Sequence, residues 1–68
     1  MSMTGKELLS KMAASYDQDQ KNGFDVMFYI GTPEHVLDEL EYDGYISKVN
    51  DIIGTIMLTE SGYREAKR

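Results

Sequence analysis

The sequence has no cysteine and a single histidine. Without cysteine the chain can form neither a disulfide framework nor a thiolate zinc site, and one imidazole is a poor start for a metal centre. No apolar run is long enough to span a bilayer, and the N-terminus lacks a basic segment followed by a hydrophobic stretch. We therefore expect a cytoplasmic protein, without a membrane partner, whose stability comes from packing or from self-association.

Basic residues are also scarce. Seven Lys and Arg stand against twelve Asp and Glu, which gives a net charge of -5, and residues 24–46 contain six acidic residues and no basic one. A phosphate-binding protein normally has the opposite sign of charge, so non-specific nucleic-acid binding is disfavoured. We interpret the acidity as a solvated helix face; the alternative is a surface that docks on a basic partner.

The remaining composition is that of a globular domain. Hydrophobic residues make up 41% of the 68 residues and charged residues 28%. A chain of this length cannot divide its apolar residues between two stable cores. We therefore expect one domain over residues 1–68, similar in size and lack of cysteine to many bacterial or phage accessory proteins.

Local signals predict a first helix over residues 5–21. Thr4 and Glu7 form a capping-box pattern, and apolar residues recur at helical spacing behind it. Thr32 and Pro33 predict the start of a second helix, because Pro suits the first helical position, and Gly44 predicts its end. Thr59 is expected to cap a last short helical turn that extends to Ala66.

Three segments are expected to form strands. Residues 24–30 are rich in aromatic and β-branched residues between two glycines, and residues 45–49 and 52–58 flank Asn50-Asp51, a pair suited to a hairpin turn. The predicted fold is therefore a two-layer α+β arrangement in the order helix, strand, helix, strand, strand, short helix, with a small antiparallel sheet packed on the helices.

One motif resembles a known family. Leu37-x-x-Leu40-Glu41-x-x-Gly44-Tyr45-Ile46, a hairpin, and then Leu58-Thr59-x-x-Gly62-Tyr63 are similar to the second half of a bacterial winged-helix domain, over about residues 33–66. The resemblance implies DNA recognition by the helix that precedes the wing. That family normally has two helices between its first strand and its wing, whereas residues 31–44 have room for one, so one helix of the usual helix-turn-helix is expected to be absent.

Two sets of residues follow as candidate contacts. Alternation along the strands places one apolar row on the sheet face away from the helices, where it can form an interface between copies of a homodimer or with another protein partner. These residues are Met27, Tyr29, Ile53 and Met57. In the alternative, a DNA-binding transcriptional regulator, the contacts come from the wing and the tail, namely Lys48, Asn50, Arg64, Lys67 and Arg68.

No cofactor, metal or catalytic site is predicted. Residues 17–23 are superficially similar to the start of an EF-hand loop, but Lys21, Asn22 and Phe28 stand where that loop needs an oxygen donor, a glycine and a bidentate glutamate. His35 can share a helix face with Asp38 or Glu39, which makes two ligands and not a site. No serine lies in a nucleophile elbow, and no glycine-rich phosphate loop occurs. We therefore expect a small non-enzymatic regulatory or accessory protein that acts by protein binding.

Overall fold

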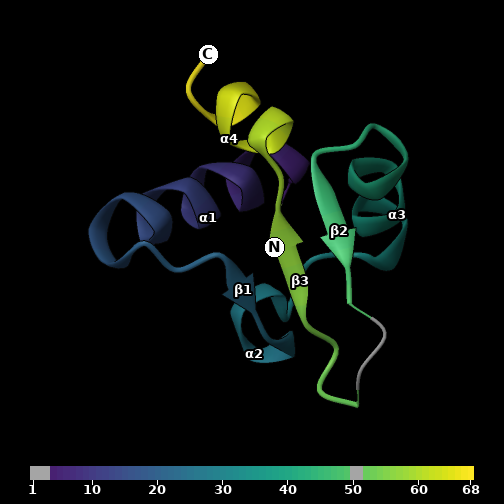
Figure 1. Ribbon diagram of the computed structural model, residues 1–68. Coiled ribbons are helices and arrows are strands. Elements are labelled where there is room, and N and C mark those ends of the chain that lie inside the picture. The colour runs from purple at the N-terminus through teal and green to yellow at the C-terminus, as the bar shows by residue number, and fades with distance from the viewer. Residues whose placement is uncertain (1–3, 50–51) are drawn as a thin grey trace.

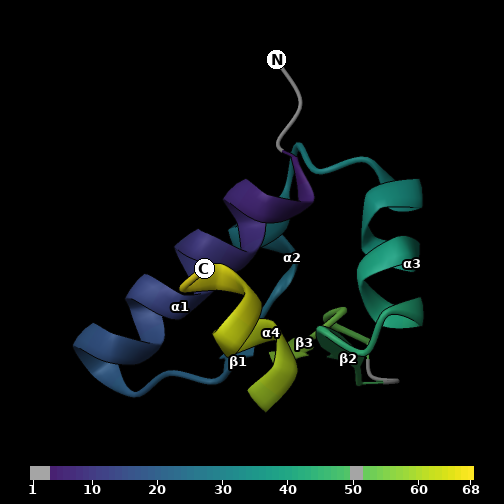
Figure 2. The same cartoon turned by 90° about the horizontal axis from the view of Figure 1, so that it is seen from above.

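The computed structural model describes residues 4–49 and 52–68. In this part of the chain, four helices and a three-stranded antiparallel sheet form an α+β fold, as the sequence predicts (Figure 1). Figure 2 shows α1 and α3 on opposite sides of the view with the sheet between them, and Gly5 at the start of α1 lies against Leu40 of α3. The elements are α1 (Gly5–Asp19), β1 (Gly23–Phe24), α2 (Val26–Tyr29), α3 (Glu34–Tyr42), β2 (Ile46–Lys48), β3 (Ile56–Leu58) and α4 (Glu60–Ala66).

Helix α1 begins where its capping signal predicts. The Thr4 hydroxyl accepts a hydrogen bond from the backbone N–H of Glu7 at 3.1 Å, which satisfies one of the unpaired donors of the first turn. The helix ends at Asp19, two residues earlier than expected, because Gln20 already adopts a left-handed conformation with φ 54°. Its apolar stripe is buried and consists of Leu8, Leu9, Met12 and Ala13.

The prediction of a strand over residues 24–30 is wrong beyond Phe24. Only Gly23 and Phe24 pair with β3, and Val26–Tyr29 forms the short helix α2. The helical turn brings the ring of Phe28 back onto that of Phe24, with 4.4 Å between their centroids, which an extended chain could not do. Two helices therefore lie between the first strand and the hairpin, and the expectation of a missing helix is also wrong.

Helix α3 ends as predicted but begins differently. Gly44 follows it with φ 81°, a conformation that favours glycine. Pro33 occupies the N-cap position itself, and its carbonyl accepts from the N–H of Val36 and of Leu37. Thr32 makes no cap, and its buried hydroxyl has no hydrogen-bond partner among the described residues. The prediction that Thr32 caps this helix is therefore wrong, because the N-cap is the next residue, Pro33.

The sheet has the strand order β1-β3-β2, and both of its pairings are antiparallel. The hairpin is confirmed, but its strands are shorter than expected, because Ile52 and Ile53 lie in the turn and not in β3. A bond of 2.8 Å from the Val49 N–H to the Thr55 carbonyl closes the hairpin below the paired strands. The predicted Asn50-Asp51 turn lies outside the described residues.

Helix α4 is fixed at its start by Thr59. The Thr59 hydroxyl accepts from the Gly62 N–H at 3.0 Å, as predicted, and donates to the Gly44 carbonyl at 2.5 Å. Gly62 sits directly on the backbone of Tyr45, where a Cβ atom would lie 2.1 Å from the carbonyl oxygen. The corner between β2, β3 and α4 therefore depends on a glycine at position 62.

One apolar core joins the elements, and the buried residues that form it are all apolar in the part of the chain that the structure describes. Among residues 4–49 and 52–68, no helix combines the length and the apolar character that crossing a bilayer requires. The core residues come from α1, β1, α3, β2 and β3, and they are Leu8, Leu9, Met12, Ala13, Phe24, Leu37, Leu40, Ile46, Ile56 and Leu58.

The Gly62 contact gives a first prediction. Gly62→Ala should lower the free energy of unfolding by about 1–3 kcal/mol, because the backbone of Tyr45 must move away from the new methyl group. Urea unfolding followed by circular dichroism measures the change. Gly23→Ala is the matched control, since its Cβ would lie at an ordinary 3.7 Å from Thr55, and equal losses in the two variants would contradict the prediction.

Packing of α4 on α1 gives a second prediction. The carboxylate of Asp17 accepts from the Tyr63 hydroxyl at 2.5 Å and from the Lys67 ammonium. Lys67 and then Tyr63, by donating these hydrogen bonds, lower the pKa of Asp17 below its ordinary value of 3.8. A carboxyl with a lowered folded-state pKa stabilises the fold above that ordinary value, and this contribution is lost as the pH falls through the folded-state pKa.

Asp17→Asn should therefore show a smaller drop in melting temperature between pH 7 and pH 3 than the native chain does. Asp19→Asn removes a carboxylate from the same helix end, but Asp19 makes no ion pair with the described residues. Thermal unfolding of the three proteins at both pH values measures the difference. Identical acid sensitivity in native protein and Asp17→Asn would show that the α1–α4 contact does not depend on this carboxylate.

Candidate functional site

The four predicted interface residues do not share one face of the sheet. Met27 and Tyr29 lie in α2, Ile53 lies in the hairpin turn, and Met57 lies in β3. Met27, Ile53 and Met57 are 69%, 57% and 38% exposed, whereas Tyr29 is half-buried. The expected row on the outer sheet face is wrong, because strand alternation does not apply to a helical segment.

Three other apolar residues of these segments are exposed as well. Val26, Ile30 and Ile52 are 45%, 64% and 103% exposed. Val26 and Met27 begin α2, and Ile30 comes directly after its last residue. No local pattern in the sequence predicts this exposure, because the aromatic and β-branched residues of the segment favour a strand.

Tyr29 holds α2 against the hairpin. Its hydroxyl donates to the carbonyl of Gly54, and a Cβ atom on Gly54 would lie 2.9 Å from that hydroxyl and 3.8 Å from the Cβ of Val26. Gly54 also has φ 70°, so glycine suits this position for two reasons. The exposed residues of α2 and of the turn are thereby brought side by side.

We call this region the α2–hairpin surface. In Figure 1, α2 and the hairpin lie at the end of the molecule opposite α4. Residues 26–30 and 52–57 contain no charged side chain. The surface consists of Val26, Met27, Ile30, Ile52 and Ile53.

The residues proposed as DNA contacts are not brought together. Lys48 lies on β2, whereas Arg64, Lys67 and Arg68 lie on α4 and just beyond it, and Figure 1 shows these elements extending in different directions. Asn50 lies outside the described residues. The basic side chains therefore form no continuous strip that could follow a phosphate backbone.

Each of these basic side chains is also paired. Lys48 lies 2.5 Å from a carboxylate oxygen of Asp38 and 3.9 Å from one of Glu41, and the hydrogen bond to Asp38 raises the pKa of Lys48 above its ordinary value of 10.5. At the other end of the chain, three ion pairs form: Arg64–Glu60, Lys67–Asp17 and Arg68–Glu65.

The three remaining lysines are engaged as well. Lys6 donates to the carbonyl of Glu65, which links the start of α1 to α4. The ammonium groups of Lys11 and Lys21 lie 4.9 Å and 5.6 Å from the ring centroids of Phe28 and Phe24. All seven basic residues therefore serve contacts within the molecule.

Helix α3 has only acidic charges. A shallow hollow on its outer side is lined by Asp38, Glu39, Tyr42 and Asp43, and Tyr42 is 92% exposed there. His35 lies on the same helix, but no group of three or more potential ligands among the described residues could hold a metal ion. The outer side of α3 is thus a negative surface with one exposed aromatic ring.

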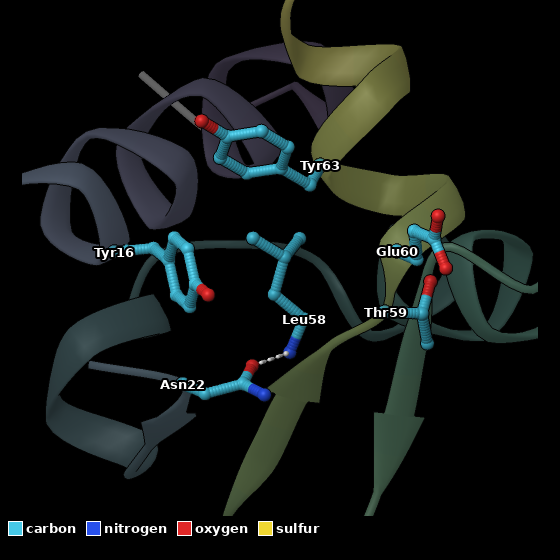
Figure 3. A pocket seen from close by; sticks show the side chains of 6 residues that line it. All are labelled: Tyr16, Asn22, Leu58, Thr59, Glu60 and Tyr63. Atoms are coloured by element: carbon cyan, nitrogen blue, oxygen red, sulfur yellow. Dashed lines mark hydrogen bonds between the residues drawn. The ribbon is translucent and has the colours of Figure 1, made fainter. Parts of the chain in front are cut away.

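A second hollow, of about 310 Å³, lies between α1, α4 and the end of β3 (Figure 3). The side chain of Leu58 points between two tyrosine rings that meet edge to face. The polar groups that line this hollow make contacts within the fold. Asn22 accepts a hydrogen bond from the Leu58 N–H at 3.1 Å, Thr59 caps α4, and Glu60 is paired with Arg64. The lining residues are Tyr16, Asn22, Leu58, Thr59, Glu60 and Tyr63.

Comparison with known proteins adds no relative. No protein-family model matches the chain, and neither curated proteins nor solved structures give a match.

The Tyr29 contact gives a third prediction. Tyr29→Phe should lower the free energy of unfolding by about 0.5–1.5 kcal/mol, because it removes the hydrogen bond to the Gly54 carbonyl and keeps the ring. Tyr42→Phe is the control, since the Tyr42 side chain is almost fully exposed. Urea unfolding of both variants measures the difference, and an unchanged stability of Tyr29→Phe would contradict the role given to this contact.

Proposed function

We propose that this chain is a non-enzymatic, winged-helix-like protein-binding module of the cytoplasm, with a regulatory or accessory role. The supporting observation is the α2–hairpin surface, where large apolar side chains are exposed together while every basic side chain is engaged within the molecule. Contiguous exposed apolar residues mark association surfaces in small proteins. Protein binding is therefore the function that the side chains favour.

Element order supports the resemblance to winged-helix domains. A helix, a strand, two helices and a hairpin follow one another, and the first strand pairs beside the last strand of the hairpin. Helix α2 is a second helix between the first strand and the hairpin, which supports this resemblance. In this comparison α3 takes the position of the helix that enters the DNA groove.

The charge of α3 disfavours the alternative, a DNA-binding transcriptional regulator. Exposed carboxylates at Asp38, Glu39 and Asp43 would face phosphates of the same sign. The nearest cation, Lys48, is already held by Asp38. The hydroxyl and carboxylate groups around the second hollow hold the fold in the same way, which supports a role without catalysis.

A titration with fluorescent duplex DNA tests this proposal. At about 25 mM salt, where phosphate contacts are strongest, the native chain should not bind at protein concentrations up to about 100 μM. Binding that weakens steeply as salt rises would replace the proposal with the DNA-binding alternative.

A pair of charge-reversed variants tests whether charge alone keeps α3 from DNA. Each variant changes three exposed carboxylates to lysine, so both reach the same net charge. The α3 variant should bind duplex DNA at low salt at least about tenfold more tightly than its control, because only there do the lysines face the groove. Equal affinities would argue against the winged-helix position of α3. The substitutions are Glu34→Lys, Glu39→Lys and Asp43→Lys on α3, and Glu7→Lys, Asp19→Lys and Asp25→Lys in the control.

A further inference from the structure

The α2–hairpin surface leaves five large apolar side chains exposed to water. Its exposed fractions, 45%, 69%, 64%, 103% and 57%, correspond to more than three fully exposed apolar side chains. With the usual apolar area of one such side chain, the exposed apolar area of the surface is on the order of 300 Å². A standard interface buries about 800 Å² per partner, of which about 65% is apolar in homodimers. Five residues thus supply more than half of the apolar area that a dimer needs.

The charge pattern limits what can cover this surface. Residues 26–30 and 52–57 contain no charged group, so the partner must also be apolar and uncharged at the contact. A basic partner would be drawn to α3 instead, where the exposed carboxylates lie. A second copy of the chain meets this requirement, because a two-fold contact places the same apolar, uncharged patch on both sides.

The small core favours the same partner. Disulfides, a metal ion or self-association can each add stability to a domain with a small core. The sequence has no cysteine, and the described residues contain no cluster that could hold a metal ion. Self-association would add to the packing of the single chain by extending its apolar core.

We propose that the α2–hairpin surface is covered by the same surface of a second copy, in a two-fold dimer. The proposal rests on the protein-binding function above, since it names the partner of the same surface. The hydrogen bond from Tyr29 to Gly54 has a specific part in it, because it aligns α2 with the hairpin turn into one contact area.

Sedimentation over about 1 μM to 1 mM protein tests the dimer. The native chain should shift from monomer to dimer with rising concentration. Met27→Glu and Ile53→Glu should each weaken dimerisation by about 30-fold or more, because each places a carboxylate in the apolar contact, where the two-fold axis doubles it. Tyr42→Glu is the matched control: it puts the same carboxylate at an exposed apolar residue on α3, and it should dimerise like the native chain.

Circular dichroism should show native helicity in all variants, because the substituted residues are exposed. Ile52→Glu is the second variant at the surface, and since Ile52 is fully exposed, its substitution removes no packing within the chain. Loss of the dimer in this variant with native helicity supports the proposal. A dimer that survives Met27→Glu, Ile53→Glu and Ile52→Glu places the interface elsewhere and overturns it.

Salt gives a readout that separates this proposal from the function on which it rests. Two copies with a net charge of -5 repel each other, so raising the salt should tighten the dimer, whereas it loosens any complex with DNA. A native chain that stays monomeric at 1 mM and at high salt overturns the second-copy proposal alone. Salt-sensitive binding to duplex DNA overturns the protein-binding function as well.

Discussion

A single core of ten apolar side chains holds the described elements together, and α1 contributes four of them. Because the ten core residues are all apolar, position within this core is set by shape and not by directed hydrogen bonds. Short elements are therefore fixed by a few close contacts at the edge of the core. Gly62 on the Tyr45 backbone places α4, the ring of Phe28 on Phe24 turns the chain into α2, and Tyr29 joins that turn to the hairpin.

Locally encoded features could be predicted from the sequence. Thr4 and Thr59 cap their helices, and Gly44 ends α3, because each signal acts within one turn of backbone. Residues 26–30 could not be assigned in this way. Their aromatic and β-branched side chains favour a strand, but the ring contact of Phe28 with Phe24 and the hydrogen bond from Tyr29 to the distant Gly54 outweigh that preference.

The candidate site, too, could be predicted only where local sequence determines it. Met27 and Ile53 were predicted to be exposed, and they are, but from a helix and a turn and not from one sheet face. Ile30 and Ile52 were missed, since their exposure follows from how α2 and the hairpin end rather than from any local pattern. The pairing of Lys48 with Asp38 joins β2 to α3, and so nothing in the sequence around Lys48 indicated that this cation is engaged.

Partner choice in this fold follows from which side chains the internal contacts leave free. Ion pairs and cation–ring contacts engage the basic residues, so α3 and its surroundings present a negative field that acts on phosphates before any groove contact can form. Apolar attraction acts only at contact and is not opposed by charge within residues 26–30 and 52–57. The proposed protein partner would therefore be selected by side chains and not by the backbone, because the exposed residues of the α2–hairpin surface are apolar and uncharged.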